Sequence, residues 1–147
     1  MRSFRFRLDR VLEWYRKKCR LEESRLAACL DLVRGVESRI ALLAAERAAI
    51  ERELLARAAI PAADFANLGR YRLRANKEEL ELQVERRRRL TEADEQRARV
   101  RRAQQRVKLV EKMRERRLEE YTAAAGRELE NLAAEAFLAR WSREHEG

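Results

Sequence analysis

The side chains that most often perform enzymatic chemistry are scarce in this sequence and widely spaced. There is one histidine, His145, so no His-based triad or metal cluster is available. The two cysteines, Cys19 and Cys29, cannot supply the four close ligands of a structural zinc site. Neither of the glycine-rich phosphate loops, GxxxxGK[ST] or GxGxxG, occurs. We therefore expect no catalytic, metal-binding or cofactor-binding residues, and no enzymatic activity.

Charged groups are abundant, with 41% charged residues and a net charge of +9. A catalytic pair of carboxylates needs a desolvated cavity, which a thin helical protein lacks. Residues 81–118 carry 14 basic and 7 acidic side chains, whereas residues 119–147 carry 3 and 7. The basic band is consistent with a solvated face, an acidic protein partner or nucleic acid. No nucleic-acid-binding motif accompanies it, so we expect no nucleic-acid partner. Arg86 to Arg89 form a ring of charge, because a helix turns about 100° per residue.

The elements that hold these charges are predicted to be long helices. Four glycines, one proline and a hydrophobic fraction of 46% favour helix over both a compact globule and a disordered chain. In the first arm, apolar residues recur at alternating steps of three and four, the heptad pattern of a left-handed coiled coil. Glu22 and Arg47 occupy the two polar positions of this seam. Its apolar members are Leu12, Tyr15, Cys19, Leu26, Cys29, Val33, Val36, Ile40, Leu43, Ile50 and Leu54.

Cys19 and Cys29 lie on this stripe, about 15 Å apart along one helix. That separation is too large for a disulfide. We interpret both as reduced core residues.

The single proline, Pro61, marks the only predicted connection. Proline is tolerated in the first turn of a helix, and Asp64 suits the positive end of a helix dipole. A short connection there forces the arms antiparallel. The predicted fold is all-α: two long helices in an antiparallel coiled-coil hairpin, one domain spanning residues 1–147, with arm one at about 4–59 and arm two at about 62–142.

The second arm has a less regular stripe: Leu80, Val84, Leu90, Ala93, Val100, Ala103, Val107 and Val110, then Leu118, Tyr121, Ala125, Leu129, Leu132 and Ala136. Gly126 could bend or break the helix there, because glycine costs about 1 kcal/mol in a helix interior relative to alanine. Arm two is longer than arm one, so residues beyond about 118 should overhang its start. An unpaired apolar stripe usually indicates a partner, although this one could fold back past Gly126.

No membrane segment is expected, because the longest uncharged stretches, such as residues 40–45, fall far short of the roughly 20 apolar residues that span a bilayer. The basic start is not followed by the apolar region of a secretory signal. We expect a cytoplasmic protein. We also expect a monomer, because one chain supplies both strands of its seam.

The opening Phe4-Arg5-Phe6-Arg7-Leu8-Asp9-Arg10-Val11-Leu12 resembles the start typical of the FliJ family. That family is also similar in length, in a proline-marked turn near residue 60, and in a basic run like residues 107–117 followed by an acidic end. The resemblance covers nearly the whole chain.

The resemblance implies a cytoplasmic component of the bacterial flagellar type III protein export apparatus, peripheral at the inner membrane. FliJ proteins are antiparallel two-helix coiled coils similar to the central stalk of rotary ATP synthases. The end carrying both termini is thought to enter the hexameric export ATPase, while the hairpin body contacts the cytoplasmic domain of the export gate. The ATPase regulator and export chaperones are further partners. The alternatives are a homologous stalk of a virulence-type secretion system and a basic helical nucleic-acid-binding protein.

We expect the ATPase contact at the end with both termini, because clustered aromatic and arginine side chains typify binding hot spots. Its residues are Phe4, Arg5, Phe6, Arg7, Arg10, Trp14, Leu132, Phe137 and Trp141. A contact with the gate or regulator is expected at Arg86, Arg89, Arg97 and Arg101. The alternative is that Phe4 and Phe6 merely pack on the C-terminal helix.

Overall fold

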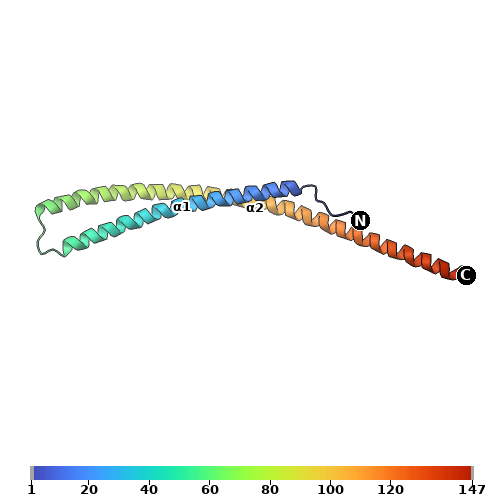
Figure 1. Cartoon of the computed structure of the whole chain (residues 1–147). Coiled ribbons are helices and arrows are strands. Elements are labelled where there is room, and N and C mark those ends of the chain that lie inside the picture. Colours follow the sequence, from blue (N-terminus) through green and yellow to red (C-terminus); the bar gives the residue numbers. More distant parts are fainter. Residues whose placement is uncertain (1, 147) are drawn as a thin grey trace. The chain divides into compact units, whose positions relative to one another are not determined.

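Two helices, α1 (Asp9–Leu55) and α2 (Ala62–His145), make up most of the computed structural model, which describes residues 2–146 (Figure 1). No strand occurs among the described residues, so the all-α two-helix prediction is confirmed. The chain divides into two compact units. We call residues 20–101 the hairpin unit, and residues 2–19 with 102–146 the terminal unit. Each helix contributes to both units.

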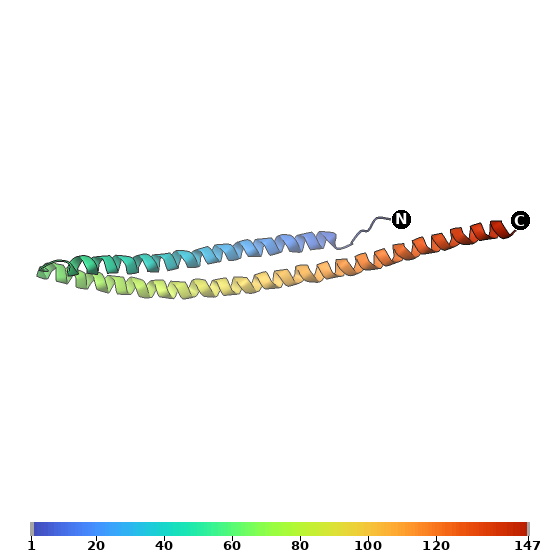
Figure 2. The same ribbon diagram turned by 90° about the horizontal axis from the view of Figure 1, so that it is seen from below.

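The connection between the helices is organised by Pro61. Its carbonyl oxygen accepts the backbone N–H groups of Asp64 at 3.1 Å and Phe65 at 3.2 Å, so proline stands immediately before α2, where its missing N–H costs nothing. The Arg57 guanidinium donates to the Asp64 carboxylate at 3.0 Å across the turn. Both views show the arms of the hairpin unit side by side (Figures 1 and 2).

The predicted limits of arm one need correction at both ends. α1 ends at Leu55 rather than near residue 59, because the residue before a proline is disfavoured in helical conformation and the chain needs several residues to reverse direction. α1 begins at Asp9 rather than near residue 4, and residues 2–6 are not helical. The Asp9 N–H donates to the carbonyl of Phe6 at 3.2 Å as the chain enters the helix.

The seam of the hairpin unit follows the heptad positions predicted for arm one. Leu43 is only 3% exposed, whereas its neighbour Leu42 is 57% exposed. Val33 and Val36 are buried as well. The remaining predicted positions are half-buried: Leu26, Cys29, Ile40, Ile50 and Leu54. The predicted register of this arm is therefore confirmed.

On α2 the seam is built from smaller residues, and the prediction was partly wrong. Ala93 and Val100 are buried and Leu90 is half-buried, as expected, and Ala75 is buried too. Leu80 and Val84, however, are 69% and 59% exposed. Leu82 and several polar residues are half-buried nearby instead, and the carboxylate of Glu78 accepts the Arg39 guanidinium at 2.6 and 3.0 Å. The prediction from hydrophobicity alone therefore placed these two residues on the wrong face of α2.

Each of the two polar residues in the arm-one stripe, Glu22 and Arg47, has a hydrogen-bond partner on α2. The buried amide of Gln96 donates to the backbone carbonyl of Glu22 at 3.0 Å and to its carboxylate. Arg47 donates to Glu79 at 2.7 Å and also to the side-chain oxygen of Asn76. Isolated polar pairs in an apolar seam fix one register, because any slip leaves a buried group unpaired.

The Glu22 contact makes the hairpin unit acid-sensitive. The Gln96 hydrogen bond, aided by the charges of Arg25 and Arg99, lowers the pKa of the Glu22 carboxyl against the opposing effect of burial. A lowered native pKa stabilises the fold above the ordinary value of 4.5, and this contribution is lost as the pH falls through the native pKa.

We therefore expect wild type to be more stable than Glu22→Gln at pH 7, with the difference closing as the pH falls below about 4.5. Urea unfolding across this range measures it. Gln96→Leu, which removes the donor, should shrink the acid-sensitive part. An equal loss of stability in wild type and Glu22→Gln on acidification would contradict the assignment.

Within residues 2–146, no helix is long and apolar enough to cross a membrane.

Candidate partner-binding surfaces

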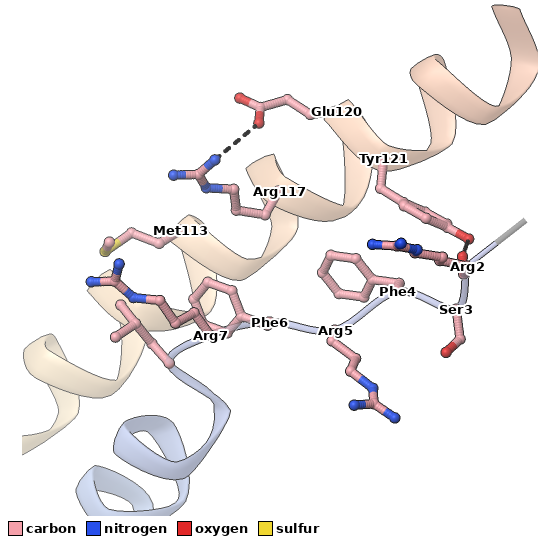
Figure 3. A pocket seen from close by; sticks show the side chains of 11 residues that line it. Arg2, Ser3, Phe4, Arg5, Phe6, Arg7, Met113, Arg117, Glu120 and Tyr121 are labelled. Carbon is pink, nitrogen blue, oxygen red and sulfur yellow. Dashed lines mark hydrogen bonds and ion pairs between the residues drawn. The ribbon is translucent and has the colours of Figure 1, made fainter. Parts of the chain in front are cut away.

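The terminal unit begins with a non-helical segment, residues 2–8, that lies along α2 (Figure 3). We call it the strap. Its Phe6 is 8% exposed and forms a small core with Leu12 and Val110. Phe4, Leu8, Tyr15 and Val107 pack against that core. The strap thus continues the apolar seam past the start of α1, and Cys19, Leu12, Val107 and Val110 lie where the heptad pattern predicted them.

Specific contacts hold the strap to α2. The rings of Phe4 and Tyr121 lie 5.6 Å apart, and the Tyr121 hydroxyl donates to the backbone carbonyl of Arg2. The Arg114 guanidinium lies 5.5 Å from the centre of the Phe4 ring and donates to Asp9 at 3.2 Å. A cation over an aromatic face and an ion pair each add a modest stabilisation. The strap is therefore an ordered part of the terminal unit.

This arrangement reassigns two of the residues predicted for a partner contact. Phe6 is buried and Phe4 is half-buried. Both rings therefore pack on α2, which was the alternative to a partner contact. The signal for this arrangement lay in the sequence. Phe4-Arg5-Phe6-Arg7 alternates apolar and basic residues, which is the period of extended backbone packed on one side.

Phe6→Ala is expected to lower the free energy of unfolding by about 3 kcal/mol, because it leaves a cavity in this small core. Phe137→Ala removes the same ring from a site that is 66% exposed, and it should change stability by less than about 0.5 kcal/mol. Chemical denaturation of the two variants measures the difference. If both changes had the same effect, the strap would not be packed as described.

The basic side chains of the strap remain accessible. Arg2, Arg5 and Arg7 line a hollow with Arg117 of α2, and Arg5 points away from the helix (Figure 3). Arg117 lies 3.7 Å from Glu120. Arg5 therefore presents positive charge on the side that the phenylalanines do not use.

Two further predicted contact residues lie at the start of α1, and both are exposed. They are Arg10 and Trp14. The ammonium group of Lys18 lies 4.4 Å from the centre of the Trp14 ring. This cation–π contact adds a second aromatic and basic site to the terminal unit.

Beyond Tyr121, α2 continues to His145, and Gly126 does not end it. We call residues 122–145 the overhang. Neither view shows another segment of the terminal unit beside its last turns (Figures 1 and 2). Its large apolar side chains are all more than half exposed: Leu129, Leu132, Phe137, Leu138 and Trp141. Leu132, Phe137 and Trp141 are thus available to a partner, as predicted contacts must be.

The four arginines predicted for the gate or regulator differ in their surroundings. Arg86 is half-buried and reaches Glu37 of α1 at 3.2 Å, and Arg89 is half-buried between Glu85 and Glu92. Arg97 pairs with Asp94, one turn earlier on α2. Arg101 is exposed and has no ion pair among the described residues. Arg86 thus joins the two arms, whereas Arg97 and Arg101 are open to solvent.

Across residues 2–146, no three His, Cys, Asp or Glu side chains come together so as to hold a metal ion. His145 stacks on Trp141, with ring centres 4.3 Å apart, and its Nδ1 lies 2.9 Å from the Trp141 carbonyl oxygen. The exposed features of the terminal unit are a basic strap and a helix that carries several large exposed apolar side chains.

Comparison with protein-family models, curated proteins and solved structures found no match.

Proposed function

We propose that this protein is a non-enzymatic stalk of a FliJ-like kind, serving the bacterial flagellar type III export apparatus at the cytoplasmic face of the inner membrane. In this role the terminal unit binds the hexameric export ATPase. The hairpin unit contacts the cytoplasmic domain of the export gate, with the ATPase regulator and export chaperones as further partners. The nonapeptide that opens with Phe4-Arg5-Phe6-Arg7 is the sequence basis for the family.

One observation carries the proposal: the overhang of the terminal unit leaves large apolar side chains exposed along its length. Leu129, Leu132 and Trp141 are about half exposed. The same unit carries the accessible guanidinium groups of Arg5 and Arg7. Exposed apolar patches of this kind mark protein-binding surfaces, and aromatic and arginine side chains dominate their energetics.

The hairpin unit supports a second contact. Arg87 and Arg88 are exposed on the ring of charge, and Arg97 and Arg101 are exposed further along α2. Their charges are accessible to an acidic surface, such as the export gate or the regulator would need to present. Electrostatic complementarity of this kind mainly raises association rates and specificity.

Arg5→Glu with Arg7→Glu is expected to abolish co-purification with the hexameric export ATPase, because two positive contacts become repulsive. Phe4 and Phe6 stay in place, so circular dichroism should be unchanged. The matched control is Arg87→Glu with Arg88→Glu, which changes the net charge equally on the hairpin unit and should leave ATPase binding intact. A folded Arg5→Glu, Arg7→Glu protein that still binds the ATPase normally moves the contact away from the strap.

A further inference from the structure

Charged side chains are sorted by side where the two helices of the terminal unit pack together. In this region, residues 9–19 of α1 lie against residues 102–116 of α2, and the Arg16 guanidinium reaches the Glu111 carboxylate at 3.2 Å. Arg16 and Glu111 each immediately follow a seam residue, so their ion pair marks one edge of the helix pair. Residues that immediately precede a seam residue lie along the opposite edge, because equivalent positions of two antiparallel helices share one side.

Acidic residues are absent from that opposite side. The region holds four acidic residues, and the helical spacing places all of them on the side of the ion pair: Asp9, Glu13, Glu111 and Glu115. The opposite side, which we call the cationic face, carries Lys18, Arg102, Arg106 and Arg116. All four of these cations are exposed, and none forms an ion pair among the described residues.

The cationic face also holds every large apolar side chain that is exposed in this region. These residues are Val11, Trp14, Leu109 and Met113, with exposed fractions from 38% to 62%. They lie among the cations: the ammonium group of Lys18 is 4.4 Å from the centre of the Trp14 ring, and Arg106 precedes Leu109 by one helical turn. Two antiparallel helices thus present cations and apolar groups together on one side.

This composition distinguishes among possible occupants of the face. A second copy would set cations against cations in either orientation, because the face has no acidic residue to pair with them. Nucleic acid would pair its phosphates with the cations but would leave the apolar side chains in water. An anionic bilayer satisfies both kinds of group, since apolar side chains enter the acyl boundary while lysine and arginine extend to the headgroups.

The arrangement of the apolar residues points the same way. They form one pair on each helix, Val11 with Trp14 and Leu109 with Met113, rather than the sustained heptad stripe that a partner helix would need. A bilayer interface is fluid and needs no such register. Tryptophan is also the side chain most typical of the headgroup level of a membrane, where its ring is apolar and its N–H is hydrated.

We propose that the cationic face of the terminal unit lies on an anionic lipid surface, with Trp14 and Leu109 at the acyl boundary and Arg102 and Arg106 against the headgroups. The inference goes beyond the proposed function and does not depend on it, because it concerns lipid rather than the ATPase or the gate.

The test uses the full chain carrying Trp141→Phe, because the protein has two tryptophans and Trp14 then reports alone. The probes are vesicles of phosphatidylglycerol and phosphatidylcholine in about equal amounts, and vesicles of phosphatidylcholine alone. Trp14 is half exposed, so its fluorescence should shift to the blue on the anionic vesicles. Binding to these should be at least about tenfold tighter than to neutral vesicles, and it should weaken as salt is added. Equal binding to both kinds of vesicle, or to neither, overturns the inference.

Charge reversal tests the face itself. Arg102→Glu with Arg106→Glu should weaken binding to the anionic vesicles at least about tenfold while circular dichroism stays unchanged, because neither side chain forms an ion pair among the described residues. The matched control is Arg87→Glu with Arg88→Glu on the hairpin unit, which changes the net charge equally and should retain most of the binding. An equal loss in the two variants would mean that net charge alone attracts the protein, and it overturns the inference.

A leucine substitution separates a bilayer from phosphate groups alone. Leu109→Ser keeps every charge and should weaken binding to the anionic vesicles at least about threefold, because one apolar side chain no longer enters the acyl boundary. Leu42→Ser, at a position of similar exposure on the hairpin unit, should leave binding unchanged. If Leu109→Ser binds the vesicles as well as the parent chain does, the face meets phosphate groups without entering a bilayer, and the inference is wrong.

Discussion

Leu43→Asp is expected to lower the free energy of unfolding by about 4 kcal/mol, because it replaces a side chain that is 3% exposed with a carboxylate that has no partner in the seam. Leu43 lies in the middle of the hairpin unit, on the face of α1 that packs against α2. Burying an unpaired charge combines the loss of apolar packing with the cost of desolvation. Urea unfolding followed by circular dichroism measures the change.

The neighbouring residue supplies the control. Leu42→Asp makes the same substitution in the same helix, so it carries the same helix-propensity cost. Leu42 is 57% exposed, and we expect a change of at most about 1 kcal/mol. Similar effects at both positions would mean that the heptad register of α1 is wrong.

The register of α1 was predictable because its periodicity is strong. Large apolar residues alternate at steps of three and four from Leu12 to Leu54, and each of these positions is buried or half-buried. The turn was predictable for a similar reason, since proline is tolerated in the first turn of a helix but not in its interior. In both cases one local rule decided the structure.

The register of α2 was less predictable because its inward positions are often small or polar. Ala75 and Gln96 are buried, whereas Leu80 is exposed. Alanine contributes little to a hydrophobic pattern, and Gln96 is inward only because Glu22 of α1 receives its amide. The hydrophobic pattern of one helix cannot predict that a residue is buried when its burial depends on a side chain of the other helix.

The strap shows a different limit. The sequence predicts that Phe4 and Phe6 form one contact surface with Arg5 and Arg7, because hot spots combine such residues. The structure separates them: the rings pack toward α2, and the guanidinium groups stay accessible. Extending arm one to residue 4 as a helix hid this separation, since a helix does not alternate faces at every residue.

Removing the overhang is expected to have the second large effect. A chain ending at Gly126 keeps the strap contacts, including Tyr121 with Phe4 and Arg2, and loses the exposed apolar face. It should remain helical with the terminal core intact. Under the proposed function, it should no longer stimulate ATP hydrolysis by the hexameric export ATPase.

In the proposed function, the terminal unit engages this ATPase through its exposed overhang and strap. The most direct measurement is the steady-state ATP hydrolysis rate of the hexamer, titrated with the full-length chain and with the chain ending at Gly126. We predict saturable stimulation by the full-length chain and none by the shortened one, with both proteins helical by circular dichroism. Equal stimulation by the two chains, or none by the full-length chain, would contradict the claim.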